Sequence, residues 1–446
     1  MSFNIGLSGL FAANKQLDVT GNNISNVATK GFKFSRAEFA DVYSATKLGS
    51  GARVVGNGVR LANVSQQFTN GDINNTGNVL DVGIQGQGFF VLNSNGSLTY
   101  TRAGNFRTDK EGYITNSDGT ARLQGYGVDA NGKIINGVLT DLRIDTSNLA
   151  PKPTDSISST INLDSNAKVI DTAAKSPAYV FNPSDNTTYT KQFSTPIYDT
   201  QGNKHVMDQY MIKTGPNTWQ TYTLVNGRNP DGTAFSMNNQ APITMKFDAS
   251  GKLQSLTPPT PASASQFTVE GNKIVMAAGA WTPGTVTKGV FTPNGAKAAP
   301  KGVNIDMTRT GSVSGETNRS VIAQNGYSTG QIASLTIDGN GVLMASFSNE
   351  QTRAIGQISL ASFTNEQGLQ PVGGTQWRET FASGIPGYDA PKTGTLGAVV
   401  SGALEESNVN LTNELVNLIK AQSNYQASAK IISTQNSIMQ TTMQMT

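Results

Sequence analysis

The 446-residue chain contains no cysteine and one histidine. The absence of cysteine excludes disulfide bonds, thiolate metal ligands and cysteine nucleophiles. The histidine, His205, lies in YDTQGNKHVMDQY just after a predicted hairpin turn, and we interpret it as a surface or edge-strand side chain. A single histidine without cysteine excludes most zinc sites and every catalytic pair that requires both residues. We therefore expect no enzymatic activity, no metal site and no cofactor.

Charged residues are also scarce. Asp, Glu, Lys and Arg make up 14% of the chain and leave a formal net charge of +3, whereas an ordinary soluble protein has about 25% charged residues. The sequence has neither a basic arm for nucleic acid nor an acidic tail. No stretch approaches the roughly 18 apolar residues of a membrane-spanning helix, and MSFNIGLSGLFAANKQ lacks the basic and apolar regions of a Sec signal peptide. We expect neither nucleic-acid binding nor membrane insertion, and any export to follow another route.

Both ends of the chain carry the alternating three- and four-residue spacing of a coiled-coil seam. The N-terminal seam runs through Leu7, Leu10, Asn14, Leu17, Gly21, Ile24 and Ala28. The C-terminal seam runs through Leu404, Asn408, Leu411, Leu415, Leu418, Gln422, Tyr425, Ala429, Ile432, Asn436, Met439 and Met443. Glu405 and Glu406 would stand at the start of this second helix and favour its dipole. Two interpretations remain open: a helical hairpin packed on the protein's own core, or a terminal pair that becomes ordered on assembly with neighbouring copies.

The region between the two ends has the pattern of β structure. Apolar residues alternate along predicted strands, as in Ile243, Met245 and Phe247, and Asp-to-Gly turns recur at short intervals. These turns lie at Asp118 and Gly119, Asp129 to Gly132, Asp199 to Gly202, Asp248 to Gly251, and Asp338 and Gly339. Regular hairpins at this density indicate antiparallel sheets, as in sandwiches or barrels.

Two shifts in composition predict the domain boundaries. SNLAPKPTDS, residues 147–156, is typical of a linker, and TPNGAKAAPKG, residues 292–302, is typical of its return partner. The predicted fold is mainly β with α-helical termini, in which a terminal coiled-coil pair is combined with two or more nested antiparallel β domains. The predicted parts are a helical domain at 1–30 and 402–446, a connecting segment at 31–75, an inner β domain at 76–150 and 303–401, and an inserted outer β domain at 151–302.

Four sequence blocks resemble a known family. LDVTGNNISNVATKGFKFSRAEFADVY is similar to the N-terminal signature of the bacterial flagellar rod and hook proteins. TGNVLDVGIQGQGFFVL and YTRAGNFRTDKEGYITNSDGTARLQGY resemble the blocks that follow, and GALEESNVNLTNELVNLIKAQSNYQASAKIISTQNSIM resembles the C-terminal helix. The resemblance covers about residues 1–126 and 330–446, and the chain length favours the hook proteins over the shorter rod proteins. The matching motif residues are Asn22, Asn23, Ile24, Asn26, Gly31, Phe32 and Lys33.

This resemblance implies a structural role outside the cell, in the hook of the bacterial flagellum. Hook subunits form a hollow, flexible helical tube that acts as a universal joint and transmits torque from the motor and rod to the filament. Paired terminal helices line the inside of the tube, and the segment 22–33 is expected to turn the chain outward from them. The implied assembly residues are Leu7, Leu10, Leu17, Ile24, Leu404, Leu411, Leu415, Leu418, Tyr425, Ile432 and Met439.

The resemblance also implies partners and a route of export. The expected partners are further copies of the chain, the distal rod protein, the hook cap, the hook–filament junction protein, the hook-length control protein and the flagellar type III export apparatus. Phe39 and Tyr43 resemble the aromatic spacing of an export signal, although two aromatic residues that pack a loop would give the same pattern.

Other functions are compatible with the same sequence. A distal flagellar rod protein would share both terminal regions. A secreted β-rich adhesin or carbohydrate-binding protein would explain the middle domain, with Trp219 as a stacking surface for sugars, and it predicts a stable monomer with ordered termini. A glycosidase would need two carboxylates in one cleft, which no spacing in the sequence indicates.

Overall fold

The computed structural model describes residues 2–42, 56–129, 132–173, 178–237, 240–259 and 266–444. The chain forms two compact units. The first unit comprises Met1–Thr146, Ala333–Ser346 and Thr352–Thr446, and the second comprises Ser147–Ile332 and Phe347–Gln351. The second unit is therefore inserted into the first, which agrees with the nested arrangement expected from the sequence.

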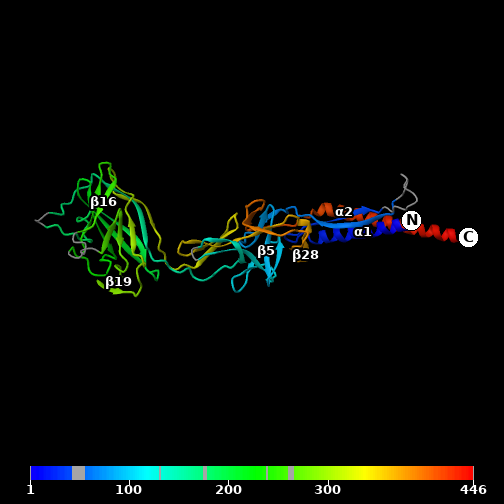
Figure 1. Cartoon of the computed structure of the whole chain (residues 1–446), viewed down its shortest axis with the longest axis horizontal. Helices are drawn as coiled ribbons and strands as arrows, with labels where there is room; N and C mark the ends of the chain where they lie inside the picture. Colours follow the sequence, from blue (N-terminus) through cyan, green and yellow to red (C-terminus); the bar gives the residue numbers. More distant parts are fainter. Residues whose placement is uncertain are drawn as a thin grey trace. The chain divides into compact units, whose positions relative to one another are not determined.

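Two long helices belong to the first unit and lie side by side (Figure 1). Helix α1 spans Ser2–Ser25 and α2 spans Leu411–Gln444, which correspond to lengths of about 36 Å and about 51 Å at 1.5 Å per residue. The side chain of Asn410 caps the start of α2, because its Oδ1 accepts a hydrogen bond from the amide of Asn413 at 3.1 Å.

Helix α2 begins later than the sequence predicts. Ala403–Glu405 forms strand β32, which pairs with β3, Ile73–Asn75. Leu404 is consequently a buried strand residue and lies outside the helical seam. Glu405 is also buried in this strand, so the expected role of Glu405 and Glu406 at the helix dipole is wrong.

The β part of the first unit is built around one sheet of thirteen strands. A long hairpin, β1 (Ser35–Asp41) with β2 (Val59–Gln66), and a short pair, β4 (Val82–Gln85) with β31 (Ala398–Ser401), lie outside it. One 3-10 turn, η2, spans Glu366–Gly368. The thirteen strands are β5 (Phe89–Ser94), β6 (Ser97–Thr101), β7 (Arg107–Thr108), β8 (Ile114–Thr115), β9 (Arg122–Val128), β10 (Ile134–Asp141), β24 (Ile332–Ile337), β25 (Val342–Phe347), β26 (Thr352–Ile358), β27 (Leu360–Ser362), β28 (Gln370–Gly373), β29 (Gln376–Arg378) and β30 (Gly387–Asp389).

Aromatic side chains form the core on one side of this sheet. Phe68, Phe89 and Trp377 meet edge to face, with ring centroids 5.6–5.8 Å apart, which is the geometry that aromatic quadrupoles favour. Phe363 packs edge-on against both Phe89 and Tyr100. This core packs together β5, β6 and β29, which carry Phe89, Tyr100 and Trp377.

Two sheets share one core in the second unit. The five-stranded sheet contains β12 (Lys191–Tyr198), β13 (Lys204–Gly215), β14 (Thr218–Val225), β15 (Ile243–Phe247) and β16 (Leu253–Thr257). The six-stranded sheet contains β11 (Ser156–Asp164), β17 (Phe267–Glu270), β18 (Lys273–Met276), β21 (Val303–Asp306), β22 (Thr310–Val313) and β23 (Asn318–Gln324), and β19 (Gly284–Thr287) pairs with β20 (Val290–Pro293). Pairing is antiparallel, as predicted, except that β11 pairs in parallel with β21 and β22.

The return boundary of the inserted unit differs from the prediction. Residues 292–302 do not leave the second unit, because Val303 and Ile305 alternate from β21 into its core and are fully buried. The chain leaves further on, where Leu149 pairs with Gly330 and Lys152 pairs with Tyr327. Proline and glycine in residues 292–302 mark an internal loop. Composition therefore placed the end of the inserted unit at residue 302, which is 30 residues before Ile332, where the main segment of the unit ends.

Four of the predicted turns share one geometry. In each, the aspartate Oδ1 accepts a hydrogen bond from the amide of the residue four positions later. The glycine three positions after the aspartate has a φ between 73° and 82°, which side chains other than glycine rarely adopt. These pairs are Asp129 with Gly132, Asp199 with Gly202, Asp248 with Gly251, and Asp338 with Gly341. At Asp338 the sequence predicted Gly339, but the glycine with positive φ is Gly341.

Alkali is expected to unfold the second unit between about pH 10 and pH 12. Burial raises the pKa of Tyr210 and of Tyr222 to about 12, from an ordinary value of about 10. Since the folded pKa exceeds the unfolded pKa, the stability is present in full below about pH 10 and is lost as the pH rises through the folded value. Tyrosinate absorbance and circular dichroism recorded together would show late ionisation coinciding with loss of β signal. Ionisation of all tyrosines near pH 10 without unfolding would contradict the expectation.

Candidate functional site

The two terminal helices meet along small and polar residues spaced seven apart. Gly6, Ala13, Thr20 and Asn23 are buried in α1, and the first three of them are seven residues apart. Glu414 and Ala421, also seven residues apart, are buried in α2. A seven-residue repeat is the period of a coiled coil. The predicted pairing of the termini is therefore present, although with different residues at its centre.

Close approach of the helix axes explains this choice of residues. A Cβ atom added to Gly6 would lie 3.1 Å from Ile432 Cγ1, and one added to Gly9 would lie 2.9 Å from Ser428 Oγ. Because Gly6 and Gly9 leave no room for a larger side chain on α1, α2 approaches closely there, and Ile432 of the predicted seam packs against Gly6. Most other bulky residues of the predicted seam are only partly buried or exposed. Leu7, Leu10, Leu17, Ile24, Leu418 and Ile432 are half-buried, whereas Leu411, Leu415, Tyr425 and Met439 are exposed.

The outward faces of both helices carry large apolar side chains. Phe11 of α1 is 60% exposed, and Ile419 and Met443 of α2 are 62% and 72% exposed. Large apolar side chains exposed in this number on one pair of helices favour a protein–protein contact as their function. The other exposed apolar residues of the two helices are Phe3, Leu411, Leu415, Val416, Tyr425, Ile431, Ile438 and Met439.

A buried charge cluster holds the base of α2 to the β part of the first unit. Glu405 Oε1 lies 2.7 Å from Lys33 Nζ, and Glu405 Oε2 lies 3.2 Å from Arg102 Nη1. All three side chains are at most 1% exposed. Lys33 also donates to the carbonyl of Thr69 at 2.6 Å, and Arg102 Nη2 donates to the carbonyl of Gly86 at 2.8 Å. One carboxylate therefore faces two cations in a site without solvent.

Burial sets the electrostatics of this cluster. It lowers the pKa of Lys33 and of Arg102, and the negative charge of Glu405 opposes the shift in both cases. Burial also raises the pKa of Glu366, while the positive charges of Arg102 and Lys33 oppose it. Since Glu405 is the carboxylate in direct contact with both cations, the cluster depends on its charge.

Two asparagines complete the junction between the helices and the strands. Asn23 pairs with the backbone of Ser35, donating to its carbonyl at 2.8 Å and accepting from its amide at 2.9 Å, and donates to Glu414 Oε2 at 3.1 Å. Asn408 accepts from the amide of Phe34 at 2.8 Å and donates to the carbonyl of Gln67 at 2.7 Å. The set Asn23, Lys33, Arg102, Glu405 and Asn408 is named here the junction clasp.

The family motif contributes to this junction in a different way from the prediction. Asn22, Asn23 and Ile24 belong to the last turn of α1 and do not form the outward turn, which begins at Asn26. Gly31 has a φ of 68°, and a Cβ at this position would lie 2.4 Å from the amide nitrogen of Ala103. Glycine is therefore required where the chain leaves the helix.

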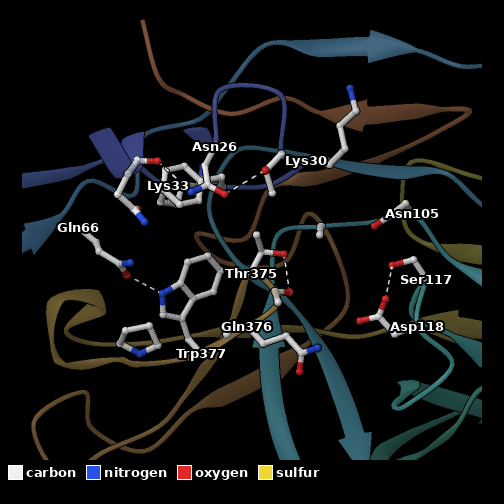
Figure 2. A pocket seen from close by; sticks show the side chains of 17 residues that line it. Asn26, Lys30, Lys33, Gln66, Asn105, Ser117, Asp118, Thr375, Gln376 and Trp377 are labelled. Carbon is white, nitrogen blue, oxygen red and sulfur yellow. Dashed lines mark hydrogen bonds between the residues drawn. The ribbon is translucent and has the colours of Figure 1, made fainter. Parts of the chain in front are cut away.

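A pocket of about 550 Å³ lies against the same motif. Figure 2 shows Asn26 and Lys30 along one side, Ser117 and Asp118 along another, and Trp377 below. The indole Nε1 of Trp377 donates to Gln66 Oε1 at 2.6 Å, which fixes the ring. Phe32 and Pro371 add apolar surface to the lining. This hollow is named here the junction pocket.

Several predicted features lie elsewhere. Phe39 is 38% exposed on β1, and Tyr43 falls outside the described residues. His205 is buried in β13, contrary to the prediction, and lies 3.1 Å from Asp199 Oδ2. Trp219 is fully buried and cannot stack on a sugar.

In the described part of the chain, no group of His, Asp and Glu could hold a metal ion, and neither helix is apolar enough to cross a membrane.

The roles of Arg102, Glu405 and Asn408 were not found from the sequence. Arg102 lies in a block that resembled the family, and Glu405 was noticed but placed on a helix. A buried arginine and a buried glutamate on predicted strands would have indicated an ion pair, because such residues are almost never buried alone.

Relatives match 99% of the chain, and family models match four of its segments. Family models match at residues 3–33 (flagella basal body rod protein), 83–171 (flagellar hook protein FlgE/F/G D1 domain), 162–327 (flagellar basal body protein FlaE D2 domain) and 400–445 (flagellar basal body rod FlgEFG protein C-terminal). The flagellar hook protein FlgE of Salmonella typhimurium is 37% identical over 99% of each chain, that of Escherichia coli 36% over 99% of each, and that of Borreliella burgdorferi 31% over 98% of this chain and 97% of its own.

A solved structure supports the fold. The crystal structure of the Helicobacter pylori flagellar hook protein FlgE2 superimposes with a TM-score of 0.50 at 14% identity, over 75% of this chain and 99% of that one. At this identity the likeness concerns the fold.

Proposed function

The chain belongs to the flagellar hook protein family, and from this premise we propose that it polymerises through its terminal helices into the hollow, flexible tube of the hook. The chain is then a structural subunit that lies outside the cell, between the rod and the filament, and transmits torque as a universal joint. A role as a distal rod protein or as an unrelated adhesin explains the similarity over the full length less well.

The exposed apolar face of the helix pair is the observation that carries this proposal. A monomer that leaves Phe11, Ile419 and Met443 in water gains free energy when another surface covers them. The helices of further copies are the covering surface that a homopolymer supplies. Close packing at Gly6 and Gly9 keeps the two helices of one subunit together, so that each copy presents the same surface.

The proposal extends to the ends of the tube and to export. The distal rod protein would contact the first subunits, and the cap, the hook–filament junction protein and the length-control protein would contact the growing end. Export through the flagellar type III apparatus would use the N-terminal region, with Phe39 as an accessible aromatic residue.

Electron microscopy of basal bodies from cells that lack this gene tests the proposal. We expect complete rods that end bare, without hook or filament, and restoration of the hook by the full-length gene. A rod that stops short would assign the chain to the rod instead, and intact flagella would overturn a role in the flagellum.

A further inference from the structure

One loop of the first unit presents two apolar side chains to solvent. In residues 379–386, which join β29 to β30, Phe381 is 105% exposed and Ile385 is 92% exposed. The next most exposed large apolar side chain in the described part of the chain is Met443, at 72%. This segment is named here the knob loop.

Hydrogen bonds hold the knob loop in one conformation. Thr380 Oγ1 donates to the carbonyl of Gly368 at 2.6 Å, and Ser383 Oγ, which is fully buried, donates to the carbonyl of Thr380 at 2.8 Å. Asn365 Nδ2 donates to the carbonyl of Ala382 at 3.0 Å. A loop fixed in this way pays little conformational entropy when Phe381 and Ile385 bind, so it is preorganised as an anchor.

The same unit also carries a hollow of suitable size. The junction pocket, at about 550 Å³, lies within the range of about 300–1,000 Å³ in which proteins enclose compact ligands. The knob loop of the same chain does not fill it, because Phe381 and Ile385 are in solvent and the loop is tied to Gly368 and Asn365.

The charged residues beside the two surfaces that form no ion pair are opposite in sign. Lys30 and Lys33 also line the junction pocket, but they pair with Glu406 and Glu405. Arg378 precedes the knob loop and is exposed, and Asp118 lines the junction pocket and is exposed. Neither residue forms an ion pair within the described residues. An arginine at the base of the knob and a carboxylate at the rim of the hollow would favour one orientation of the loop in the pocket.

We propose that the knob loop of one copy inserts Phe381 and Ile385 into the junction pocket of a second copy. The inference rests on the proposed function, since it identifies a contact within the polymer. Because the knob and the hollow are different surfaces, each contact leaves one knob and one hollow free, so the contact can repeat along an open helical polymer. Such a contact would tie the β parts of neighbouring subunits together at the same level as the helix junction.

Engineered cysteines test this contact cleanly, because the chain has none of its own. In polymers isolated from cells that express Ile385→Cys with Ser117→Cys, oxidation is expected to give a ladder of covalent multimers on a denaturing gel. The control Ile385→Cys with Ser97→Cys places the second thiol at an exposed serine outside the pocket, and it is expected to give dimers at most. Polymers that form without a ladder would overturn the proposed contact, whereas failure of the unmodified chain to polymerise would overturn the proposed function.

A second pair of variants measures the strength of the contact. Phe381→Ser with Ile385→Ser is expected to raise the critical concentration for polymerisation about tenfold or more, as loss of a central apolar anchor does, while the monomer unfolds as before. Ile135→Ser with Val138→Ser removes two exposed apolar side chains from β10 of the same unit. This control pair is expected to change the critical concentration less than about threefold. Equal effects of the two pairs would contradict a specific role for the knob loop.

Discussion

Replacing Glu405 with glutamine is expected to lower the free energy of unfolding of the first unit by about 3–5 kcal/mol. The substitution keeps the shape of the side chain but removes the carboxylate that contacts Lys33 and Arg102, so two buried cations lose the counter-charge in direct contact with them. Urea unfolding, followed by circular dichroism of the purified chain, would measure the loss.

The neighbouring carboxylate provides the control. Glu406 pairs with Lys30, and these side chains are 22% and 36% exposed, so Glu406→Gln is expected to cost about 1 kcal/mol or less. Adding Lys33→Met to Glu405→Gln removes one of the two unpaired cations and should restore part of the loss. If Glu405→Gln and Glu406→Gln had equal effects, the buried cluster would not stabilise the junction as the geometry indicates.

The start of α2 shows why part of this site could not be predicted. Leu404 and Asn408 continue the helical spacing of the sequence, yet Ala403–Glu405 pairs with Ile73–Asn75. Local periodicity contains no information on a strand partner more than 300 residues away. Asn410 gave a local signal for the start of the helix, because asparagine is a preferred N-cap residue.

For the contact between the two helices, the sequence predicted the pairing but not the residues at the contact. The presence of two paired terminal helices followed from their apolar spacing, and the structure confirms it. The spacing placed large apolar residues of both helices inside, whereas at the closest approach α1 contributes Gly6 and Gly9, which face Ile432 and Ser428 of α2. Which apolar face of a helix meets its intramolecular partner, and which stays free for other copies, depends on the distance between the helix axes.

The Asp-to-Gly turns were predictable because their cause is local. An aspartate side chain that accepts from a nearby amide and a glycine with positive φ suffice to fix such a turn. The inserted unit was also predictable, but its return boundary was not, because Val303 and Ile305 join a core formed by distant strands.

Removal of α2 is expected to abolish polymerisation without unfolding the β structure. A chain that ends at Asn410 retains Glu405 and Asn408, so the junction clasp keeps its charges, but it loses every apolar residue that α2 exposes. A chain that ends at Gly402 also loses Leu404 and Glu405, so its first unit is expected to unfold at clearly lower urea concentration than that of the Asn410 chain. The pair of truncations therefore separates assembly from stability.

Sedimentation of the full-length chain and the Asn410 chain, under conditions in which the full-length chain forms tubes visible by electron microscopy, tests the central claim most directly. We predict that the full-length chain sediments as a polymer, and that the Asn410 chain remains a monomer with its β circular-dichroism signal intact. Tubes formed by the chain without α2 would show that the terminal helices are not the surface through which the subunits assemble.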